Sequence, residues 1–381
     1  MSWTLPLTDV RLTEEDIAAF IGVLESGWLT MGPRTHEFEL AFARRFGVRH
    51  AVAVSSGTAA LHLALRAAGV GEGDEVLVQD MTFVADAAAV RYCGARPVLV
   101  DSIGPEDLNL DPEDVARHIG PRTRAVLATH WLGYACDLAA LERLCRQHGL
   151  ILIEDCAQSI TARDADGRLT GTVGTAGCFS FFSKKQLALG EGGMILTSDD
   201  AIAEGARSLR SHAMTSMTWD RHRGHAESYD IVDVGFNFRI DEPRAALGLS
   251  RLPRVDGDVA RRRELVRRYR ERLAEVPGLT IPWTDDDVER GSHFGFAILL
   301  GSEEIRGRVA RELADRGIQT THYPAISSLR AYRDYAGQPR AEDLAARHLL
   351  LPLSSLFTDR EVDLVVGHLR QVLAAHAAPA V

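Results

Sequence analysis

A lysine at the end of an apolar run is the residue of this chain best suited to covalent chemistry. Lys185 lies in SFFSKKQLALGEGG, residues 180–193. The apolar lead-in is typical of a buried strand end, and the glycines that follow allow backbone or ligand to approach closely. An amine in such a place is partly desolvated, which lowers its pKa and makes it a nucleophile toward a carbonyl group. The segment therefore predicts a Schiff-base lysine, with Lys184 as a rival amine that the pattern alone does not exclude.

A second segment is suited to binding a phosphate group. Residues 55–65, SSGTAALHLAL, place Gly57 and Thr58 in a turn between an expected strand and an expected helix. Backbone N–H groups and the positive end of a helix dipole meet at such a turn, and both favour an anion. Ser180 offers a hydroxyl group to the same anion. The alternative is an ordinary Ser or Thr helix cap without a ligand.

An acid and an aromatic ring complete the set. Asp155 ends the apolar run LILIED, residues 150–155, where open α/β sheets place their ligands. A carboxylate there can keep a pyridine nitrogen protonated, whereas Glu154 would point to the other face of the strand. Phe83, in MTFVAD, follows another strand end and can stack on a ring. A capping acid and a core phenylalanine are the simpler alternatives. Amine, phosphate turn, acid and ring together indicate pyridoxal phosphate (PLP).

The elements that must position these residues alternate between strand and helix. From about residue 50 to 200, apolar runs are separated by stretches with helical spacing of apolar residues. This alternation predicts an α/β fold with a mostly parallel sheet. The expected strands of this sheet are AVAVSS, EVLVQD, RPVLVD, RAVLATH, LILIED and GMILTS.

The chain is expected to divide near residue 253. Residues 1–252 form the predicted large domain, and residues 253–381 a smaller C-terminal α+β domain. The expected helices outside the alternating region are 12–26, 36–46, 199–213, 242–252, 256–276, 303–315 and 359–375, and the expected C-terminal strands are 292–300 and 318–322.

One long segment, residues 213–231, interrupts the periodicity and is expected to be a loop. It holds His222 and His225 in an HxxH arrangement near Asp220. A polar solvated loop is preferred over a metal site there, because no companion ligands show metal-site spacing. No metal is therefore predicted.

Composition excludes several classes of protein. The chain has 381 residues, 46% hydrophobic, with a formal net charge of −10. It lacks the basic patch of a nucleic-acid binder, and its locally basic run at 260–272 is expected to be a solvated helix face with acidic neighbours. No secretory signal or membrane-length apolar run is present. The five scattered cysteines suit reduced, buried thiols, and a cytoplasmic location is expected.

Six ordered motifs resemble one family nearly end to end, the nucleotide-sugar aminotransferases of the DegT/StrS type within the fold-type I PLP enzymes. The motifs are LESGWLTMGP (24–33), VSSGTAALHLAL (54–65), EDCAQS (154–159), FSFFSKKQLALGEGG (179–193), GFNFRIDEPRAALG (235–248) and THYP (321–324). The resemblance implies a mixed, mostly parallel sheet between helices. Two regions depart from the family pattern, the loop at 213–231 and THWLGYACD at 129–137. Both regions would border the substrate, so the resemblance does not identify the acceptor substrate.

The resemblance also implies a role for each matched position. Lys185 matches the Schiff-base lysine and Asp155 the partner of the pyridine nitrogen. The implied contacts to the cofactor, PLP or its amine form PMP, are Gly57, Thr58, Phe83, Gln158, Ser180 and, from the second subunit, Asn237. The implied substrate-binding residues are Trp28, Thr30, Arg239, His322 and Tyr323. The contact from Asn237 implies a homodimer with shared active sites.

The implied activity is transfer of an amino group from L-glutamate to a keto sugar. A nucleotide-linked 4-keto or 3-keto hexose is the expected acceptor, and a cyclitol ketone is an alternative. A PLP-dependent sugar dehydratase and a non-catalytic regulatory homologue are rival functions on this scaffold. Dehydratases of this type usually carry histidine in place of the lysine, so Lys185 argues against the first. Intact Lys185 and Asp155 argue against the second.

Overall fold

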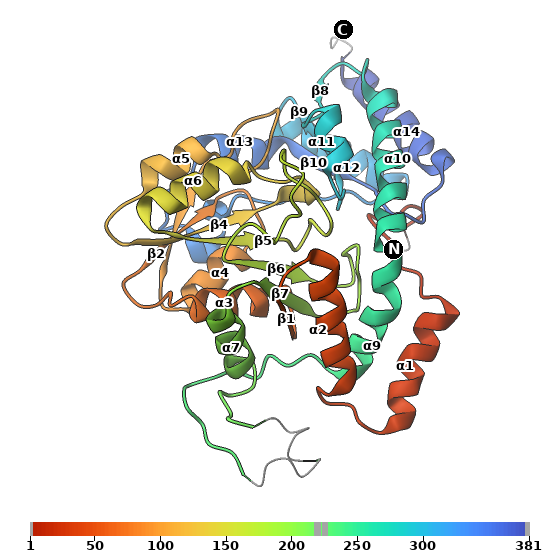
Figure 1. The fold of residues 1–381 in the computed structure, drawn as a ribbon. Coiled ribbons are helices and arrows are strands. Elements are labelled where there is room, and N and C mark those ends of the chain that lie inside the picture. Colours follow the sequence, from red (N-terminus) through yellow and green to blue (C-terminus); the bar gives the residue numbers. More distant parts are fainter. Residues whose placement is uncertain (1–2, 217–221, 223–227, 378–381) are drawn as a thin grey trace.

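The computed structural model describes residues 3–216, 222 and 228–377. A seven-stranded sheet runs through its centre (Figure 1). The strands are β1 (His50–Val54), β2 (Glu75–Gln79), β3 (Arg96–Val100), β4 (Thr123–Thr129), β5 (Ile151–Asp155), β6 (Ala176–Ser180) and β7 (Gly193–Thr197).

The sheet is mixed and mostly parallel, as predicted. Its strand order is β1-β7-β6-β5-β4-β2-β3, and β3, β2, β4, β5 and β6 pair in parallel. Only β7 runs antiparallel to its neighbours, β6 and β1. The carboxyl ends of β2, β4 and β5 therefore meet at one edge of the sheet, which is where such sheets place their ligands.

Helices cover both faces of this sheet. Figure 1 shows α3 (Gly57–Ala67), α4 (Ala85–Tyr92) and α7 (Asp200–Leu209) below it, and α5 (Pro112–His118) and α6 (Leu138–His148) above it. Two further helices, α2 (Pro33–Phe46) and α9 (Glu242–Arg251), pack with the β1, β6 and β7 end of the sheet through an apolar cluster that includes Phe38, Phe42 and Phe181. The outer helix α1 (Glu14–Ser26) lies against α9.

The C-terminal part forms a small antiparallel sheet of order β10-β9-β8, with helices around it. Helix α10 follows the 3₁₀ turn Leu252–Arg254, close to the predicted domain boundary, which stays a prediction. The elements here are α10 (Val255–Leu273), β8 (Leu279–Thr280), α11 (Asp285–Arg290), β9 (Phe296–Leu300), α12 (Glu303–Asp315), α13 (Pro339–Arg347), β10 (His348–Leu351) and α14 (Asp359–Ala377).

One predicted C-terminal strand is wrong. Residues 318–322 form only two isolated bridges, Ile318 with Leu5 and Thr321 with Leu350. The two bridges have partners from opposite ends of the chain, so no continuous ladder develops. The strand that pairs with β9 is β10 instead, which is uniformly buried. The predicted strand at 292–300 is shorter, because His293 has a φ of 55° and interrupts an extended backbone.

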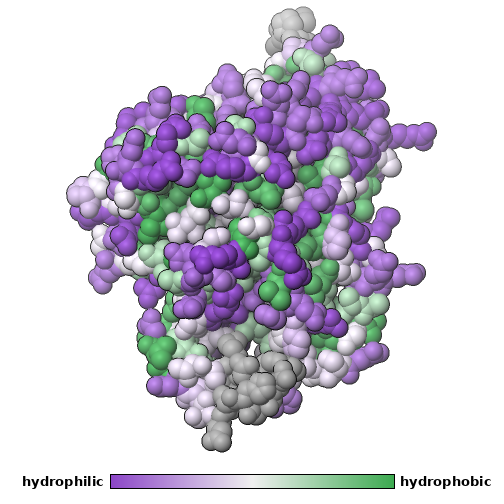
Figure 2. Space-filling view, in the orientation of Figure 1, coloured by the Kyte–Doolittle hydropathy of each residue, from purple (hydrophilic) through white to green (hydrophobic). Residues whose placement is uncertain are grey.

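The arginine-rich run on α10 is balanced by nearby acids. Arg267 pairs with Glu289, Arg268 with Asp363, and Arg270 with Asp285. Figure 2 shows hydrophilic residues gathered over the upper part of the molecule, where α10, α11 and α14 lie in Figure 1. These pairs account for the local basicity without a polyanionic ligand.

Three smaller predictions concern other parts of the chain. All five cysteines lie in the described part, where they are buried and unpaired. Among the described residues, no helix has the length and apolar character needed to cross a bilayer. The predicted loop at 213–231 is described at its two ends, where Met214 pairs with Ile231, and at His222, whose ring centre lies 4.5 Å from that of Trp28. Asp220 and His225 lie outside the described residues.

Candidate active site

Segments distant in sequence converge on one pocket of about 270 Å³ at the carboxyl edge of the sheet. The pocket lies where β5 ends and α3 begins, and two residues of the C-terminal part, Phe294 and Tyr323, also line it. The predicted residues that line it are Gly57, Thr58, Phe83, Asp155, Gln158, Ser180, Lys185 and Tyr323. The pocket also includes Lys184, the rival amine.

The amino end of α3 forms a tight cradle on the floor of the pocket. Ser56 caps the helix, with its Oγ accepting from Ala59 N at 3.1 Å. A Cβ added to Gly57 would lie 2.7 Å from Ser180 Cβ, so the turn and the strand end approach this closely only because residue 57 is glycine. The unbonded N–H groups of the first helical turn and the Ser180 hydroxyl then face the same space. A phosphate group fits this donor set.

The turn after β6 carries the two lysines. Phe181 N donates to Gly192 O at 2.8 Å and Ser183 N to Gly190 O at 3.0 Å, which folds residues 181–192 back on themselves. Gly190 has a φ of 89°, a left-handed conformation that favours glycine. The turn holds Lys185 in the pocket wall, partly buried, while Lys184 is exposed.

Lys185 has the electrostatics of a nucleophilic amine. Its Nζ lies 4.4 Å from the centre of the Phe294 ring. Desolvation by burial lowers the pKa of Lys185 to about 8, against the opposing attraction of Asp155. Roughly a tenth of the amine is therefore unprotonated at pH 7, far more than for an ordinary lysine, and Schiff-base chemistry uses this form.

Asp155 is a buried carboxylate presented by the last residue of β5. The residue is 5% exposed within the pocket wall, and its Oδ1 accepts from Ala157 N at 2.7 Å. That bond orients one oxygen of the carboxylate in the pocket wall. A protonated ring nitrogen is a suitable partner for such a carboxylate.

Glu154, the competing acid, has a different task. It is fully buried and accepts from the backbone N–H groups of Gly171, Val173 and Gly174 at 2.7–2.8 Å. His130 Nε2 lies 2.9 Å from Glu154 Oε2, while His130 Nδ1 accepts from Cys136 N. These bonds to His130 and the backbone hold the pKa of Glu154 below its usual value despite burial. Glu154 thus holds the backbone of the β5–β6 connection in place through three hydrogen bonds.

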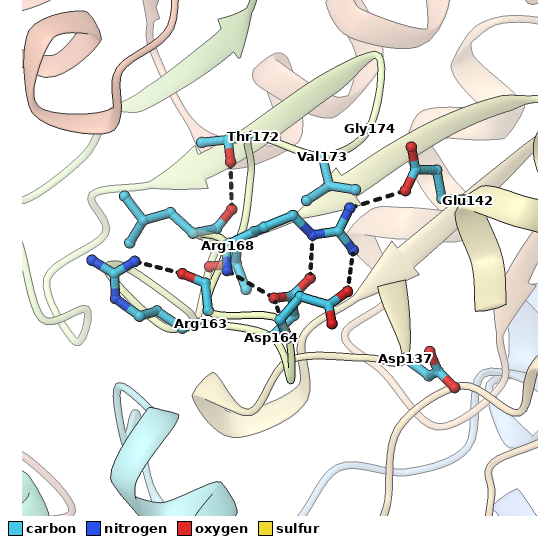
Figure 3. A network of polar contacts seen from close by, with 12 residues as sticks. Asp137, Glu142, Arg163, Asp164, Arg168, Thr172, Val173 and Gly174 are labelled. Carbon is cyan, nitrogen blue, oxygen red and sulfur yellow. Dashed lines mark hydrogen bonds and ion pairs between the residues drawn. The ribbon is translucent and has the colours of Figure 1, made fainter. Parts of the chain in front are cut away.

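The same connection is fixed from outside by Arg168 (Figure 3). Its guanidinium donates to Asp164 Oδ2 at 2.8 Å and to Glu142 Oε2, on α6, at 2.9 Å. The connection also carries Gln158, whose Oε1 accepts from Leu132 N at 2.7 Å. Because that bond fixes the amide oxygen, the amide nitrogen of Gln158 is the atom presented to a ligand.

Two aromatic side chains frame the mouth of the pocket. Phe83 is 54% exposed, and its ring lies 6.5 Å from that of Tyr323 in an edge-to-face arrangement. Tyr323 is held by its backbone N–H, which donates to His348 Nε2 at 2.9 Å. An aromatic ligand between these side chains would cover Phe83, which is otherwise an exposed apolar surface.

Five predicted residues do not line this pocket. Asn237 is exposed on the segment after the loop, although the carbonyl of its neighbour Phe238 accepts from Ser55 N beside the cradle. Thr30 and His322 are also exposed, and Arg239 is half-buried. Trp28 lines a separate cavity of about 1000 Å³ between α1, α2 and α9.

Some residues of the pocket were not predicted from the sequence. Thr82 adjoins Phe83 in MTFVAD, so that motif held the signal. Glu191 lies in the glycine-rich turn that was already singled out. Phe294, which covers the Lys185 amine, lies in SHFGF and has no local feature that marks it. Asp86 lies next to the pocket in the first turn of α4. Acids are common at that position of a helix, so the sequence does not mark it as part of the site.

Comparison with known proteins agrees with this geometry. The model of the DegT/DnrJ/EryC1/StrS aminotransferase family matches residues 10–370. A dTDP-4-dehydro-2,3,6-trideoxy-D-glucose 4-aminotransferase of Saccharopolyspora spinosa is 37% identical, over 96% of each chain. The aminotransferase TlmJ of Streptoalloteichus hindustanus has a similar structure, with 36% identity and a TM-score of 0.90 over 98% of this chain and 100% of that one.

A further solved structure of a relative contains a reaction intermediate. DesV of S. venezuelae, in complex with a ketimine intermediate, is 34% identical with a TM-score of 0.89, over 98% of this chain and 99% of that one. The predicted resemblance and the predicted fold-type I architecture are both confirmed by these matches.

Proposed function

The chain belongs to the DegT/DnrJ/EryC1/StrS aminotransferase family, and we propose that it uses PLP to move an amino group from L-glutamate to a nucleotide-linked keto hexose. The observation that carries the proposal is the placement of a Lys185 amine of lowered pKa in one pocket with the Asp155 carboxylate and the α3 cradle. An amine, a carboxylate and an anion site are the three groups that PLP requires.

The cofactor is proposed on the fit of these residues. Gly57, Thr58 and Ser180 would receive the phosphate, Asp155 the ring nitrogen and Lys185 the aldehyde carbon. Phe83 would cover the ring and Gln158 would donate to its hydroxyl oxygen. When bound, PLP supplies an electron sink for the pair of electrons left after a C–H bond of the amino donor breaks.

The remaining steps belong to side chains of this protein. The Lys185 Nζ, unprotonated in part near pH 8, takes a proton from the α-carbon of the donor. Asp155 holds the proton on the ring nitrogen, since its negative charge favours the charged ring. The desolvated position of Lys185 beneath Phe294 keeps water away from that proton transfer. The acceptor ketone follows the same steps in reverse.

A keto sugar is the proposed acceptor because of the named activity of the relative from Saccharopolyspora spinosa, which acts at C4 of a dTDP-linked hexose. A 4-keto sugar is therefore the first acceptor to test, and a 3-keto sugar the second. The proposed sugar-side residues are Trp28, Thr30, His322 and Tyr323.

Arg239 is the proposed receptor for a carboxylate of glutamate. No acid among the described residues pairs with it, and burial together with nearby Arg210 lowers the pKa of its guanidinium. A half-buried cation without a counter-ion is stabilised by an anionic ligand.

We also propose a homodimer with shared active sites. Helix α1 exposes Ile17, Phe20, Ile21 and Leu24, which form one apolar stripe at helical spacing. The segment that leads to Asn237 exposes Ile231, Val232 and Val234, each at least 47% accessible. Apolar surfaces of this kind mark a protein interface, and a second copy would bring its Asn237 to the phosphate.

The test of the proposed function is a pair of half-reactions. The purified protein reconstituted with PLP should lose its near-visible absorbance band on addition of L-glutamate and release 2-oxoglutarate. Adding a dTDP-4-keto hexose should restore the band and yield an amino sugar. A panel with 3-keto sugar nucleotides and cyclitol ketones identifies the acceptor. An unchanged spectrum with glutamate and other amino donors would refute an aminotransferase function.

A further inference from the structure

A second buried carboxyl group lies directly behind the pocket. Asp86 is the second residue of α4 and is fully buried. Its Oδ2 accepts from Thr129 Oγ1 at 2.5 Å and from Thr82 Oγ1 at 3.2 Å. Its Oδ1 is also buried, and no N–H or hydroxyl group of the described residues donates to it. One oxygen of this carboxyl group is thus left without a conventional donor.

The group that Asp86 meets is the carboxyl group of Asp155. The charge of Asp155 is felt directly by Asp86, whose pKa it raises. The arrangement follows from the sheet, because Thr129 on β4 is the register partner of Asp155 on β5 and its hydroxyl holds Asp86. Two adjacent ionised carboxylates are both acceptors and repel each other, so a proton on one of the two is favoured.

The proton belongs on Asp86. Burial, and then the charge of Asp155, raise the pKa of Asp86 well above its usual value, and the two threonine hydroxyls offset only part of this. The other titratable groups that face the pair are the Lys185 amine, the Tyr323 hydroxyl group and the thiols of Cys156 and Cys178. Burial raises the pKa of the tyrosine and of both thiols, so these three groups are neutral near pH 7. The amino end of α4 favours the charged form of Asp86, and burial of the whole carboxyl group opposes it.

We propose that Asp86 is a positioning residue for Asp155: the two carboxyl groups share one proton, held on Asp86 Oδ1, which donates to the Asp155 carboxylate and fixes it toward the pocket. In this arrangement the pair carries a single negative charge. That charge balances one positive charge on a ring nitrogen, whereas two adjacent carboxylates would repel each other without a second cation. This consequence for the ring nitrogen rests on the proposed function, but the shared proton does not.

Two substitutions test whether Asp86 acts as a neutral hydrogen-bond donor or as a negative charge. Asp86→Asn replaces the acid O–H by an amide N–H, which is a permanent neutral donor of nearly the same shape. Asp86→Leu has a similar branched shape, is larger and has no donor. If Asp86 is a neutral donor, Asp86→Asn should keep kcat and PLP affinity within about threefold of the wild type, as expected for a donor that replaces a donor. Asp86→Leu should lose on the order of tenfold or more in kcat.

The decisive measurement uses the protein without cofactor. A group with a raised folded-state pKa stabilises the fold below its unfolded pKa, about 4, and this stabilisation is lost as the pH rises toward the folded-state value. The folding equilibrium constant of the wild type should therefore fall by about tenfold per pH unit relative to Asp86→Asn above about pH 5. Infrared spectra at neutral pH should also show a protonated-acid C=O band that Asp86→Asn lacks.

Specific outcomes would overturn the proposal. One is a ratio of the two folding equilibrium constants, wild type to Asp86→Asn, that stays constant across this pH range. The other is the absence of a protonated-acid C=O band from the infrared spectrum of the wild type at neutral pH. Equal losses of activity in both variants, or full activity in a folded Asp86→Leu, would also contradict it. If Asp86→Leu does not fold, the titration of Asp86→Asn still decides. Because both physical measurements use cofactor-free protein, they stand even if the transaminase assays fail.

Discussion

The chemistry of single residues in this protein depends on burial next to charge. Lys185 lies in a pocket with Asp155, yet its pKa is lowered because desolvation outweighs the attraction of the Asp155 carboxylate. Its neighbour Lys184 differs by one position and remains exposed. The local sequence indicated an amine at a buried strand end but left the two lysines open. Packing by Phe294, more than 100 positions along the chain, separates them, and no local pattern contains that contact.

The lowered pKa makes a prediction about how the cofactor is acquired. Only the unprotonated amine attacks an aldehyde, so the rate of PLP attachment to the cofactor-free protein should rise with pH and level off above about 8. Stopped-flow absorbance at a series of pH values measures this. A rate that continues to rise toward 10.5, the ordinary value for lysine, would show that Lys185 is not desolvated.

A second residue prediction concerns the charge of Asp155. Asp155→Asn should fold and bind PLP, but it should lose on the order of 100-fold in kcat, because an amide cannot balance a protonated ring nitrogen. The matched control is Asp166→Asn, whose side chain is 64% exposed in the same connection. It should keep full activity. Turnover near that of the wild type in Asp155→Asn would remove Asp155 from its proposed role.

At the scale of elements, the β5–β6 connection is the part that the rest of the site depends on. Glu154 binds three of its backbone N–H groups, and Arg168 ties it to α6 (Figure 3). The sequence showed two adjacent acids and the alternation of a strand, which correctly placed Glu154 on the face away from Asp155. It could not show the anchoring role, since the three N–H groups lie 17 to 20 positions further along the chain.

The structural contributions of Glu154, which is buried, and Glu142, which is partly exposed, can be compared by measuring the free energy of unfolding. Glu154→Ala leaves His130 and three buried N–H groups without their acceptor, and the free energy of unfolding should fall by about 3–5 kcal/mol. Glu142→Ala removes two partly exposed ion pairs, with Arg168 and with Arg146, and should cost about 1 kcal/mol or less. Urea unfolding of the two variants provides the comparison. Equal losses would mean that Glu154 does not anchor the connection.

Some elements were predictable and others were not, for physical reasons. Helix α12 spans the predicted 303–315, since Ser302 caps its start and its apolar residues keep a helical spacing. Strand β10 was missed because HLLL follows α13 without a turn residue between them. The wrong strand at 318–322 has a suitable composition but no continuous partner. Pairing across the chain, which composition does not encode, decides such cases.

At the scale of the whole molecule, most of the proposed cofactor contacts lie in one pocket of a single chain, but Asn237 does not. The Asn237 residue is exposed and follows an exposed apolar segment, as expected for a residue that contacts the cofactor of a neighbouring copy. Sequence alone contains no information on which copy a residue serves, so this part of the site came only from the resemblance. The domain boundary near residue 253 likewise stays a prediction.

The shared site can be tested by complementation. Lys185→Ala and Asn237→Ala should each be inactive as homodimers. After subunit exchange, mixed dimers hold one site with both lesions and one site with neither, so activity should return to part of the wild-type value. Mass measurement confirms that mixed dimers form, and Lys184→Ala mixed with Asn237→Ala is the matched control. Mixed dimers that stay inactive would show that Asn237 acts within its own subunit.

The identity of the attachment residue tests the central proposal most directly. The protein reconstituted with PLP should be reduced with borohydride, digested and mapped by mass spectrometry, with Lys184→Ala and Lys185→Ala treated alongside. The cofactor mass should be found on Lys185 in the wild type and in Lys184→Ala, and it should be absent from Lys185→Ala, which should also lack the absorbance band. Cofactor on Lys184, or stable labelling of Lys185→Ala, would contradict the proposed active site.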